Sequence, residues 1–86
     1  MWFMTKKQQF IADIKRCRGI DFAQIGQMVE VGGDIGTIKG LNDSGNLDIV
    51  FANTLKYGIH KHNCHPTWDI KYYDKYGEVI RSFGRN

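Results

Sequence analysis

Four side chains that can bind a transition metal lie close together in the sequence, at His60, His62, Cys64 and His65. Zinc is bound by imidazole nitrogen and thiolate sulfur in a tetrahedral arrangement, so this cluster is a candidate metal site. Structural zinc sites commonly take two ligands from each of two clusters, and the sequence holds no second cluster. The alternative is a polar loop whose histidines form hydrogen bonds or lie in water. The sequence therefore predicts no metal and no other cofactor.

A thiol nucleophile is the second kind of chemistry that these residues offer. A histidine can activate a cysteine thiolate, which makes Cys64 with His62 or His65 a candidate pair. Neighbouring residues on one loop rarely point at each other, and the sequence shows no third group that would orient the histidine. We therefore expect a protein that is not an enzyme. Cys17 and Cys64 are expected to be reduced thiols, since no secretory signal pattern accompanies them.

The distribution of charge points to a different function, the binding of an anion. The chain has a net charge of +3. Residues 1–26 carry five basic and two acidic side chains, whereas residues 27–86 carry seven of each, so the whole excess lies in the N-terminal segment. The candidate phosphate contacts are the helix cations Lys15, Arg16 and Arg18, with Lys39 and Lys56 from strand ends.

Aromatic side chains add a candidate stacking surface for nucleic-acid bases. Side chains alternate along a strand, so about half of the aromatic residues are expected in the core, and we assign Trp68 and Tyr72 to the interior together with Phe51. Tyr57, Tyr73 and Tyr76 are then expected at the surface. Tyr57 and Tyr73 join the predicted nucleic-acid contacts.

A basic helix is predicted over residues 5–18, between a suitable N-cap at Thr5 and a helix-ending glycine at Gly19. Its apolar side chains recur on one stripe, at Phe10, Ile11, Ile14 and Cys17. The basic residues lie mostly on the other surface, and those of the first turn oppose the helix dipole, which favours fraying. Three roles stay open for this helix: contact with phosphates, an ordinary solvated face, or docking over the rest of the domain.

From Gln27 onward the hydrophobic period changes to two, which predicts short antiparallel strands. We expect strands at residues 27–31, 47–51, 55–60, 68–72 and 78–83. The connections are rich in glycine, as at Gly32-Gly33 and in Asp43-Ser44-Gly45-Asn46, which suit the positive φ of tight hairpins. Five short strands separated by turns suggest a small barrel, because closure removes exposed sheet edges.

The stretch Gly26-Gln-Met-Val-Glu-Val-Gly-Gly-Asp-Ile-Gly-Thr-Ile-Lys-Gly-Leu, followed by Leu47-Asp-Ile-Val-Phe51, resembles the opening hairpins of KOW and Tudor-like SH3 barrels. The resemblance implies a single domain over residues 1–86, mainly β with one N-terminal helix (α+β), in which residues 26–83 form a small SH3-like five-stranded antiparallel barrel. It also implies an association with nucleic acid or with the transcription and translation machinery. The run from Cys64 to Asp74 is similar to the ends of small phage-encoded proteins.

Together these features predict a cytoplasmic, non-enzymatic binding module whose partner is nucleic acid or a nucleic-acid-handling protein complex. The alternative is a phage-type protein-interaction module, an inhibitor or adaptor of a host protein, that uses the barrel edge and the apolar residues Trp2 and Phe3. No apolar run approaches the ~20 residues that span a bilayer, so no membrane partner is expected. The identity of the partner and the oligomeric state are left open.

Overall fold

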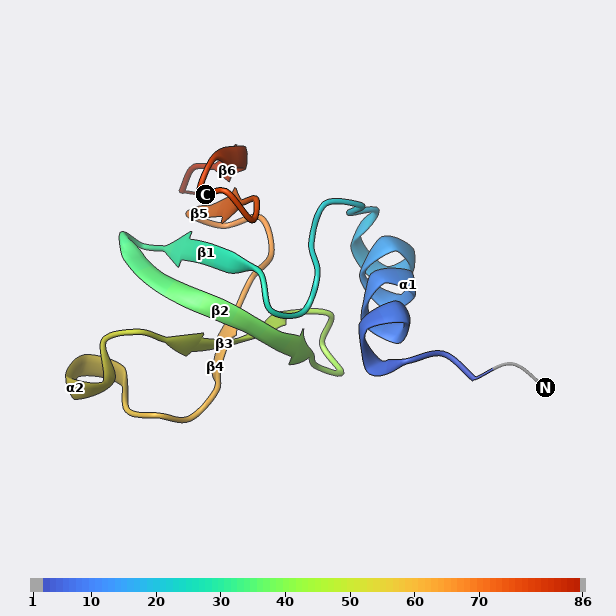
Figure 1. The fold of residues 1–86 in the computed structure, drawn as a ribbon, viewed down its shortest axis with the longest axis horizontal. Helices are drawn as coiled ribbons and strands as arrows, with labels where there is room; N and C mark the ends of the chain where they lie inside the picture. The colour runs from blue at the N-terminus through green and yellow to red at the C-terminus, as the bar shows by residue number, and fades with distance from the viewer. Residues whose placement is uncertain (1–2, 86) are drawn as a thin grey trace.

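A computed structural model describes residues 3–85 of the chain as one helix beside a six-stranded antiparallel sheet (Figure 1). The helix is α1 (Lys6–Arg18), and a single helical turn, α2 (Thr54–Tyr57), interrupts the strands. The strands are β1 (Met28–Val31), β2 (Asp34–Leu41), β3 (Leu47–Phe51), β4 (His62–Cys64), β5 (Ile70–Tyr73) and β6 (Val79–Phe83). Figure 1 places α1 and α2 at opposite ends of the molecule.

The strand order is β4-β3-β2-β1-β5-β6. The predicted fold class, mainly β with one N-terminal helix, is confirmed. The predicted closed barrel of five strands is not observed, because the sheet has six strands and β4 and β6 form its two open edges within residues 3–85. The first four strands form a meander, and β5 then returns to pair with β1.

Helix α1 begins and ends where sequence-specific caps place it. The Thr5 hydroxyl accepts a hydrogen bond from the backbone N–H of Gln8, and the Gln8 side chain accepts one from the Thr5 N–H, a capping box. Gly19 closes the helix with a positive φ of 67°. The first turn is therefore helical, and its cap satisfies backbone groups that fraying would expose.

The apolar stripe of α1 is narrower than the sequence suggests. Phe10 and Ile14 are buried in the core and α1 packs against β2, so the helix docks on the sheet. Ile11 and Cys17, expected on the same stripe, are exposed. Only the residues four apart, one helical turn, face the sheet.

Two of the predicted hairpins are confirmed in detail. Gly32 and Gly33 form a two-residue turn between β1 and β2 in which both φ angles are positive, at 59° and 89°. The β2–β3 turn is organised by Asn42, whose side-chain oxygen accepts hydrogen bonds from the N–H groups of Ser44 and Asn46.

The prediction of a strand over residues 55–60 is wrong, because the helical turn α2 occupies part of this segment. The Asn53 side chain caps α2 by accepting a hydrogen bond from the Lys56 N–H at 3.2 Å, and the Tyr57 ring stacks on Phe51 at 4.1 Å. Leu55 and Ile59 alternate in sequence as strand residues do, but both are exposed. The local cap and the aromatic anchor therefore outweigh the period-two pattern.

Two further strands lie where the sequence indicates turns. The longest strand, β2, contains Gly36 and Gly40, and β4 falls within the expected loop from His62 to Pro66. Trp68, expected inside, is 52% exposed and stacks on His65. Asp69 has a positive φ of 49°, which breaks the alternation before β5 begins at Ile70.

The core fills one face of the sheet and the contact with α1. Its fully buried side chains are Ile14, Val29, Ile38, Leu47, Ile49, Ile70 and Tyr72. Gly36 is part of this packing, because a Cβ placed there would lie 2.5 Å from the Ile49 Cγ2 and 3.2 Å from the Val50 carbonyl oxygen. The Ile49 side chain of β3 can lie this close to the backbone of β2 only because residue 36 has no side chain.

Replacing Gly36 with Ala is therefore expected to reduce the free energy of unfolding by about 1–3 kcal/mol, the usual cost of overpacking a core. Gly40→Ala is the matched control, since its added Cβ would meet only the Asp48 carboxylate at 3.8 Å. Urea denaturation of the two variants and the wild type measures the difference. Equal stability of the two variants would contradict this account of the β2–β3 packing.

Candidate cationic groove

Three cations of α1 are predicted phosphate contacts, and two of them, Arg16 and Arg18, have protein partners. The Arg18 guanidinium donates to the Gly45 carbonyl at 3.0 Å and to the Asn46 side-chain oxygen at 2.9 Å, which fastens the end of α1 to the β2–β3 turn. Arg16 pairs with Asp13 at 3.2 Å. Lys15 is exposed.

Lys56 and Tyr57 form a second polar cluster on α2, at the opposite end of the molecule from α1 (Figure 1). The Tyr57 hydroxyl and the Lys56 ammonium both donate to the Asp34 carboxylate, Lys56 at 3.1 Å. The hydrogen bond from Tyr57, followed by that from Lys56, lowers the pKa of Asp34, and the same carboxylate raises the pKa of Lys56 and of Tyr57. Since the Tyr57 ring also covers Phe51, its role here is to hold α2 against β3.

Lys39 on β2 and Tyr73 on β5 each line a hollow at the surface. The two hollows share one lining residue, Ile25. The larger, of about 780 Å³, is lined by Tyr73 together with Lys7 and Lys75. The smaller, of about 230 Å³, is lined by Lys39 together with Lys6 and Lys61. We call the two together the lysine groove, defined by Lys6, Lys7, Lys39, Lys61 and Lys75.

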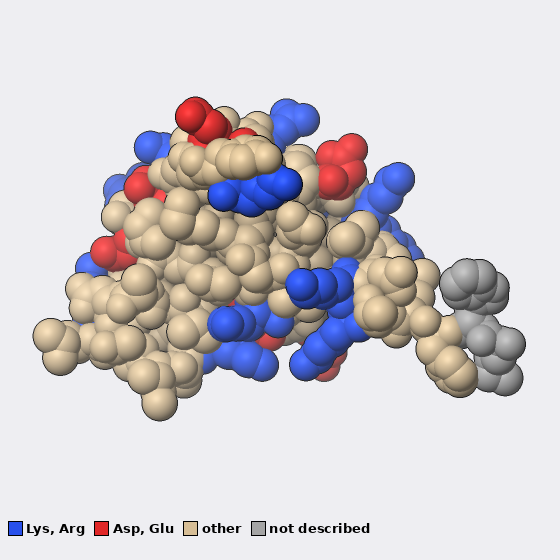
Figure 2. Space-filling view, viewed as in Figure 1, with Lys and Arg blue, Asp and Glu red and all other residues tan. Residues whose placement is uncertain are grey.

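The surface view agrees with this placement. In Figure 2, Lys and Arg side chains run through the middle of the visible face, and most of the acidic side chains on that face lie toward its upper and left margins. Within residues 3–85, none of the five groove lysines forms an ion pair. Helix α1 also has no acidic residue in its first turn, so the positive end of its dipole adds to the potential beside Lys6 and Lys7.

Three carboxylates line the groove as well, and each accepts hydrogen bonds from neighbouring protein groups. Asp13 accepts hydrogen bonds from the Gln9 and Arg16 side chains, which lower its pKa. Asp74 accepts from the backbone N–H groups of Tyr76 and Glu78 at 2.8 and 3.0 Å. Asp48 is the third. With five lysines against three carboxylates, the groove keeps a net positive charge.

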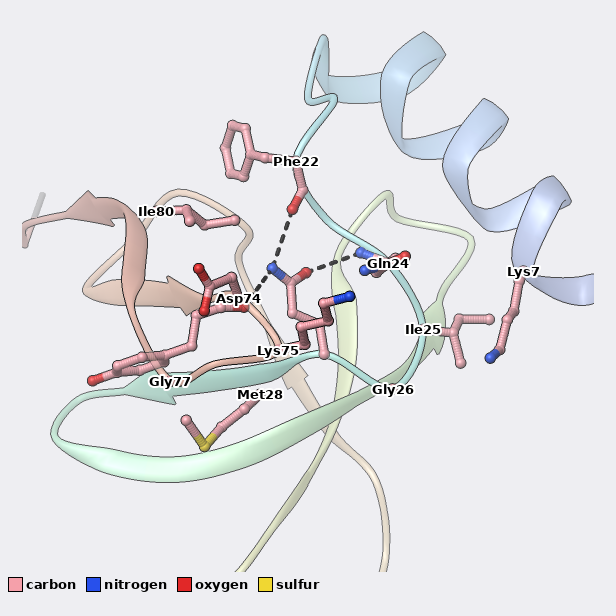
Figure 3. A pocket seen from close by; sticks show the side chains of 12 residues that line it. Lys7, Phe22, Gln24, Ile25, Gly26, Met28, Asp74, Lys75, Gly77 and Ile80 are labelled. Carbon is pink, nitrogen blue, oxygen red and sulfur yellow. Dashed lines mark hydrogen bonds between the residues drawn. The ribbon is translucent and has the colours of Figure 1, made fainter.

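The floor of the larger hollow is built around Gln27, the only buried polar residue among those described, at 8% exposure. Its side-chain nitrogen donates to the carbonyls of Phe22 at 3.1 Å and Tyr73 at 3.0 Å. Its oxygen accepts the Gln24 N–H at 3.0 Å. These bonds join the segment after α1 to the end of β5, the two sides of the hollow (Figure 3). The hollow is thus a fixed feature of the fold.

The histidine and cysteine cluster does not converge on one point. His62 Nε2 lies 2.7 Å from the Tyr57 carbonyl oxygen, and His65 stacks on Trp68 with 4.0 Å between ring centres. No group of three potential ligands that could hold a metal is found in the part of the chain that the structure describes. Burial, with a smaller contribution from Asp48, raises the pKa of the Cys64 thiol, which disfavours the thiolate that a nucleophile needs.

Sequence analysis missed four of the five groove lysines. One signal was available: Thr5 and Gln8 have the spacing of a capping box, which predicts that the first turn is formed and that Lys6 and Lys7 are held in place. Lys61 and Lys75 lie in connections between strands, and no local pattern places them beside α1.

The apolar N-terminal residues are only partly covered by the structure. Trp2 lies outside the described residues, and Phe3 is 80% exposed. Within residues 3–85, no helix combines the length and apolar character that crossing a bilayer requires.

Comparison with protein-family models, with curated proteins and with solved structures finds no match to this chain. The functional argument therefore rests on the geometry of the groove.

Replacing Gln27 with Glu is expected to lower the free energy of unfolding by about 1–3 kcal/mol at neutral pH, because a carboxylate cannot donate to the Phe22 and Tyr73 carbonyls. Burial raises the pKa of such a carboxyl, so the loss is greatest above that raised pKa. It should shrink as the pH falls toward the ordinary glutamate value of about 4.3. Urea unfolding at two pH values tests this. Gln24→Glu, the same change at an exposed site, should stay within about 0.5 kcal/mol of wild type, and equal losses in both variants would refute the role of Gln27.

A second prediction concerns His65, whose Nδ1 accepts a hydrogen bond from the Thr67 N–H at 3.1 Å. Burial, and then the Arg18 charge, lower the pKa of His65 from its ordinary 6.5. Its contribution to stability is therefore present above pH 6.5 and lost as the pH falls through the folded-state pKa. His65→Asn keeps a side-chain acceptor but does not titrate there. The melting temperature of the variant should fall less than that of the wild type on acidification, and parallel profiles would contradict the assignment.

Proposed function

We propose that this chain is a non-enzymatic nucleic-acid-binding module and that the lysine groove is its phosphate-binding surface. The observation that carries the proposal is that five lysines without ion pairs among the described residues, from four separate segments, line two hollows that share Ile25. Such an arrangement leaves like charges close together, which costs free energy in the unbound protein. An anionic partner removes that cost.

We assign the fold of this module to the SH3-like type. In support, β1 pairs with both β2 and β5, and the meander from β1 to β4 precedes the return of β5. This connectivity agrees with the resemblance of residues 26–51 to KOW and Tudor-like hairpins. Strand β6 and helix α1 would then be additions to that arrangement, and both contribute walls to the groove through Ile80 and Lys7.

Lysine ammonium groups on flexible stems bind phosphates as point charges and carry little sequence information. The module is therefore proposed to hold nucleic acid with little dependence on base sequence, as an accessory to a larger nucleic-acid-handling complex. The predicted contacts Lys39 and Tyr73 remain in this proposal, Tyr73 through its ring, since its hydroxyl donates to the Glu30 carboxylate at 3.5 Å. Lys6, Lys7, Lys61 and Lys75 are added to them, whereas Arg16, Arg18, Lys56 and Tyr57 have protein partners that compete with such a role.

The alternative is a protein-interaction module, and one observation favours it. On the α2 loop Leu55 is fully exposed and Ile59 nearly so, although Tyr57 between them is anchored to Phe51 and Asp34. A rigid loop that presents two aliphatic side chains is typical of a docking contact. A partner captured by the wild type, retained by Phe3→Ser and lost by Leu55→Ser with Ile59→Ser, would support this second function.

The proposed function is tested by fluorescence anisotropy with labelled oligonucleotides at about 50 mM salt and above. Binding should weaken linearly in a plot of log affinity against log salt. Lys39→Glu should weaken binding about tenfold at low salt and reduce the salt slope by about one contact.

Lys15→Glu is the matched control, because it makes the same charge change at an exposed α1 position outside both hollows. It should change affinity about threefold or less, as expected for a distant charge. No binding of single- or double-stranded oligonucleotides at low salt would rule out the proposed function. Equal effects of the two variants would show that net charge, and not the groove, is responsible.

A further inference from the structure

The larger hollow of the lysine groove has apolar walls that phosphate binding does not require. Phe22, Ile25, Met28 and Ile80 line it (Figure 3). Met28 is 36% and Ile80 43% exposed, so part of this apolar surface is in contact with water. A ligand with an apolar face would be favoured here, since it removes that surface from solvent.

A nucleobase has a flat face of this kind together with a polar edge. In a duplex the faces are stacked on neighbouring bases and only the edges reach the grooves, so a base can enter a hollow only when it is unpaired and unstacked. The volume of about 780 Å³ is in the range of pockets that enclose small organic ligands.

Polar groups in the same hollow suit the edge of a base. The Gln24 side-chain amide has no hydrogen-bond partner within residues 3–85, and it can both donate and accept. The Asp74 carboxylate is held by the backbone of the β5–β6 turn through one oxygen, which leaves the other as an acceptor. In Figure 3, Gln24 and Asp74 come from opposite sides of the hollow.

Lysines flank this hollow in an order that a phosphate backbone could follow. Lys75 and Lys7 line the larger hollow, and Lys6, the next residue to Lys7 on α1, lines the smaller one with Lys39 and Lys61. The two hollows share Ile25. Lysines therefore lie in the lining of both hollows, with the adjacent pair Lys6 and Lys7 divided between them.

We infer that the lysine groove is selective for single-stranded nucleic acid, with one unpaired base held between Ile25, Met28 and Ile80 and the adjoining phosphates on the groove lysines. This inference rests on the proposed function and adds the class of strand that the site takes. A rigid duplex cannot place a base in the hollow and uses only the lysines.

The test compares a labelled single strand of about 16 nucleotides with the duplex formed by the same strand and its complement, at one salt concentration. The single strand should bind about tenfold more tightly. Ile80→Ser should remove most of that difference while leaving duplex affinity unchanged, because the loss of one packed base costs about this factor.

Val79→Ser is the matched control, since Val79 is the neighbouring residue on β6, has similar exposure at 49% and does not line the hollow. It should keep the full single-strand preference. Melting curves establish that both variants are folded. Equal affinity for strand and duplex, or an equal effect of both substitutions, overturns the inference even if Lys39→Glu still weakens binding. Absence of all binding removes the proposed function itself.

A second readout reports contact directly. In methyl-labelled protein, the Met28 and Ile80 methyl resonances should shift on addition of the single strand and shift far less with the duplex. The Val79 methyl resonances should not shift in either titration. Shifts confined to lysine-bearing segments would leave phosphate binding intact and contradict the insertion of a base.

Discussion

The placement of the connection between α1 and β1 against the sheet depends on a single buried amide, that of Gln27. Two of its three hydrogen bonds stay within the connection between α1 and β1, to Gln24 and Phe22, and the third reaches the Tyr73 carbonyl at the end of β5. The backbone beside it is paired with Ile38 of β2 in both directions. Because an unpaired polar group in this position would be costly, the connection, β2 and β5 must adopt this relative placement together. The hollow of the lysine groove is a direct result of that placement.

Arg18 and the groove lysines differ in their surroundings. The Arg18 guanidinium joins α1 to the β2–β3 turn through several oriented donors, a geometry that a lysine cannot reproduce. The groove lysines carry charge without a fixed geometry, which suits a partner whose phosphates vary in position. Arg18 is thus a structural cation that holds the helix, whereas the groove lysines are surface cations without an ion pair within residues 3–85.

Prediction from sequence succeeded where the physical cause was local. The strand at residues 47–51, the Asp43–Asn46 turn and the helix from Thr5 to Gly19 follow from side-chain alternation, positive-φ glycine and capping. It failed at residues 55–60, where the Tyr57 ring stacks on Phe51 of β3. It also failed at Trp68, because the positive φ of Asp69 interrupts the alternation of side chains. The strand β2 was missed because Gly36, usually a strand breaker, allows a close approach to Ile49.

The sequence by itself determined a mainly β domain with a capped basic helix and a surplus of positive charge, because composition, periodicity and caps act over a few residues. Only the tertiary structure decided which cations lie together. Lys6, Lys39, Lys61 and Lys75 are far apart in the chain, and their common position depends on how α1 is fastened to the sheet by Arg18, Phe10 and Ile14. Long-range packing sets that position, and no local pattern encodes it.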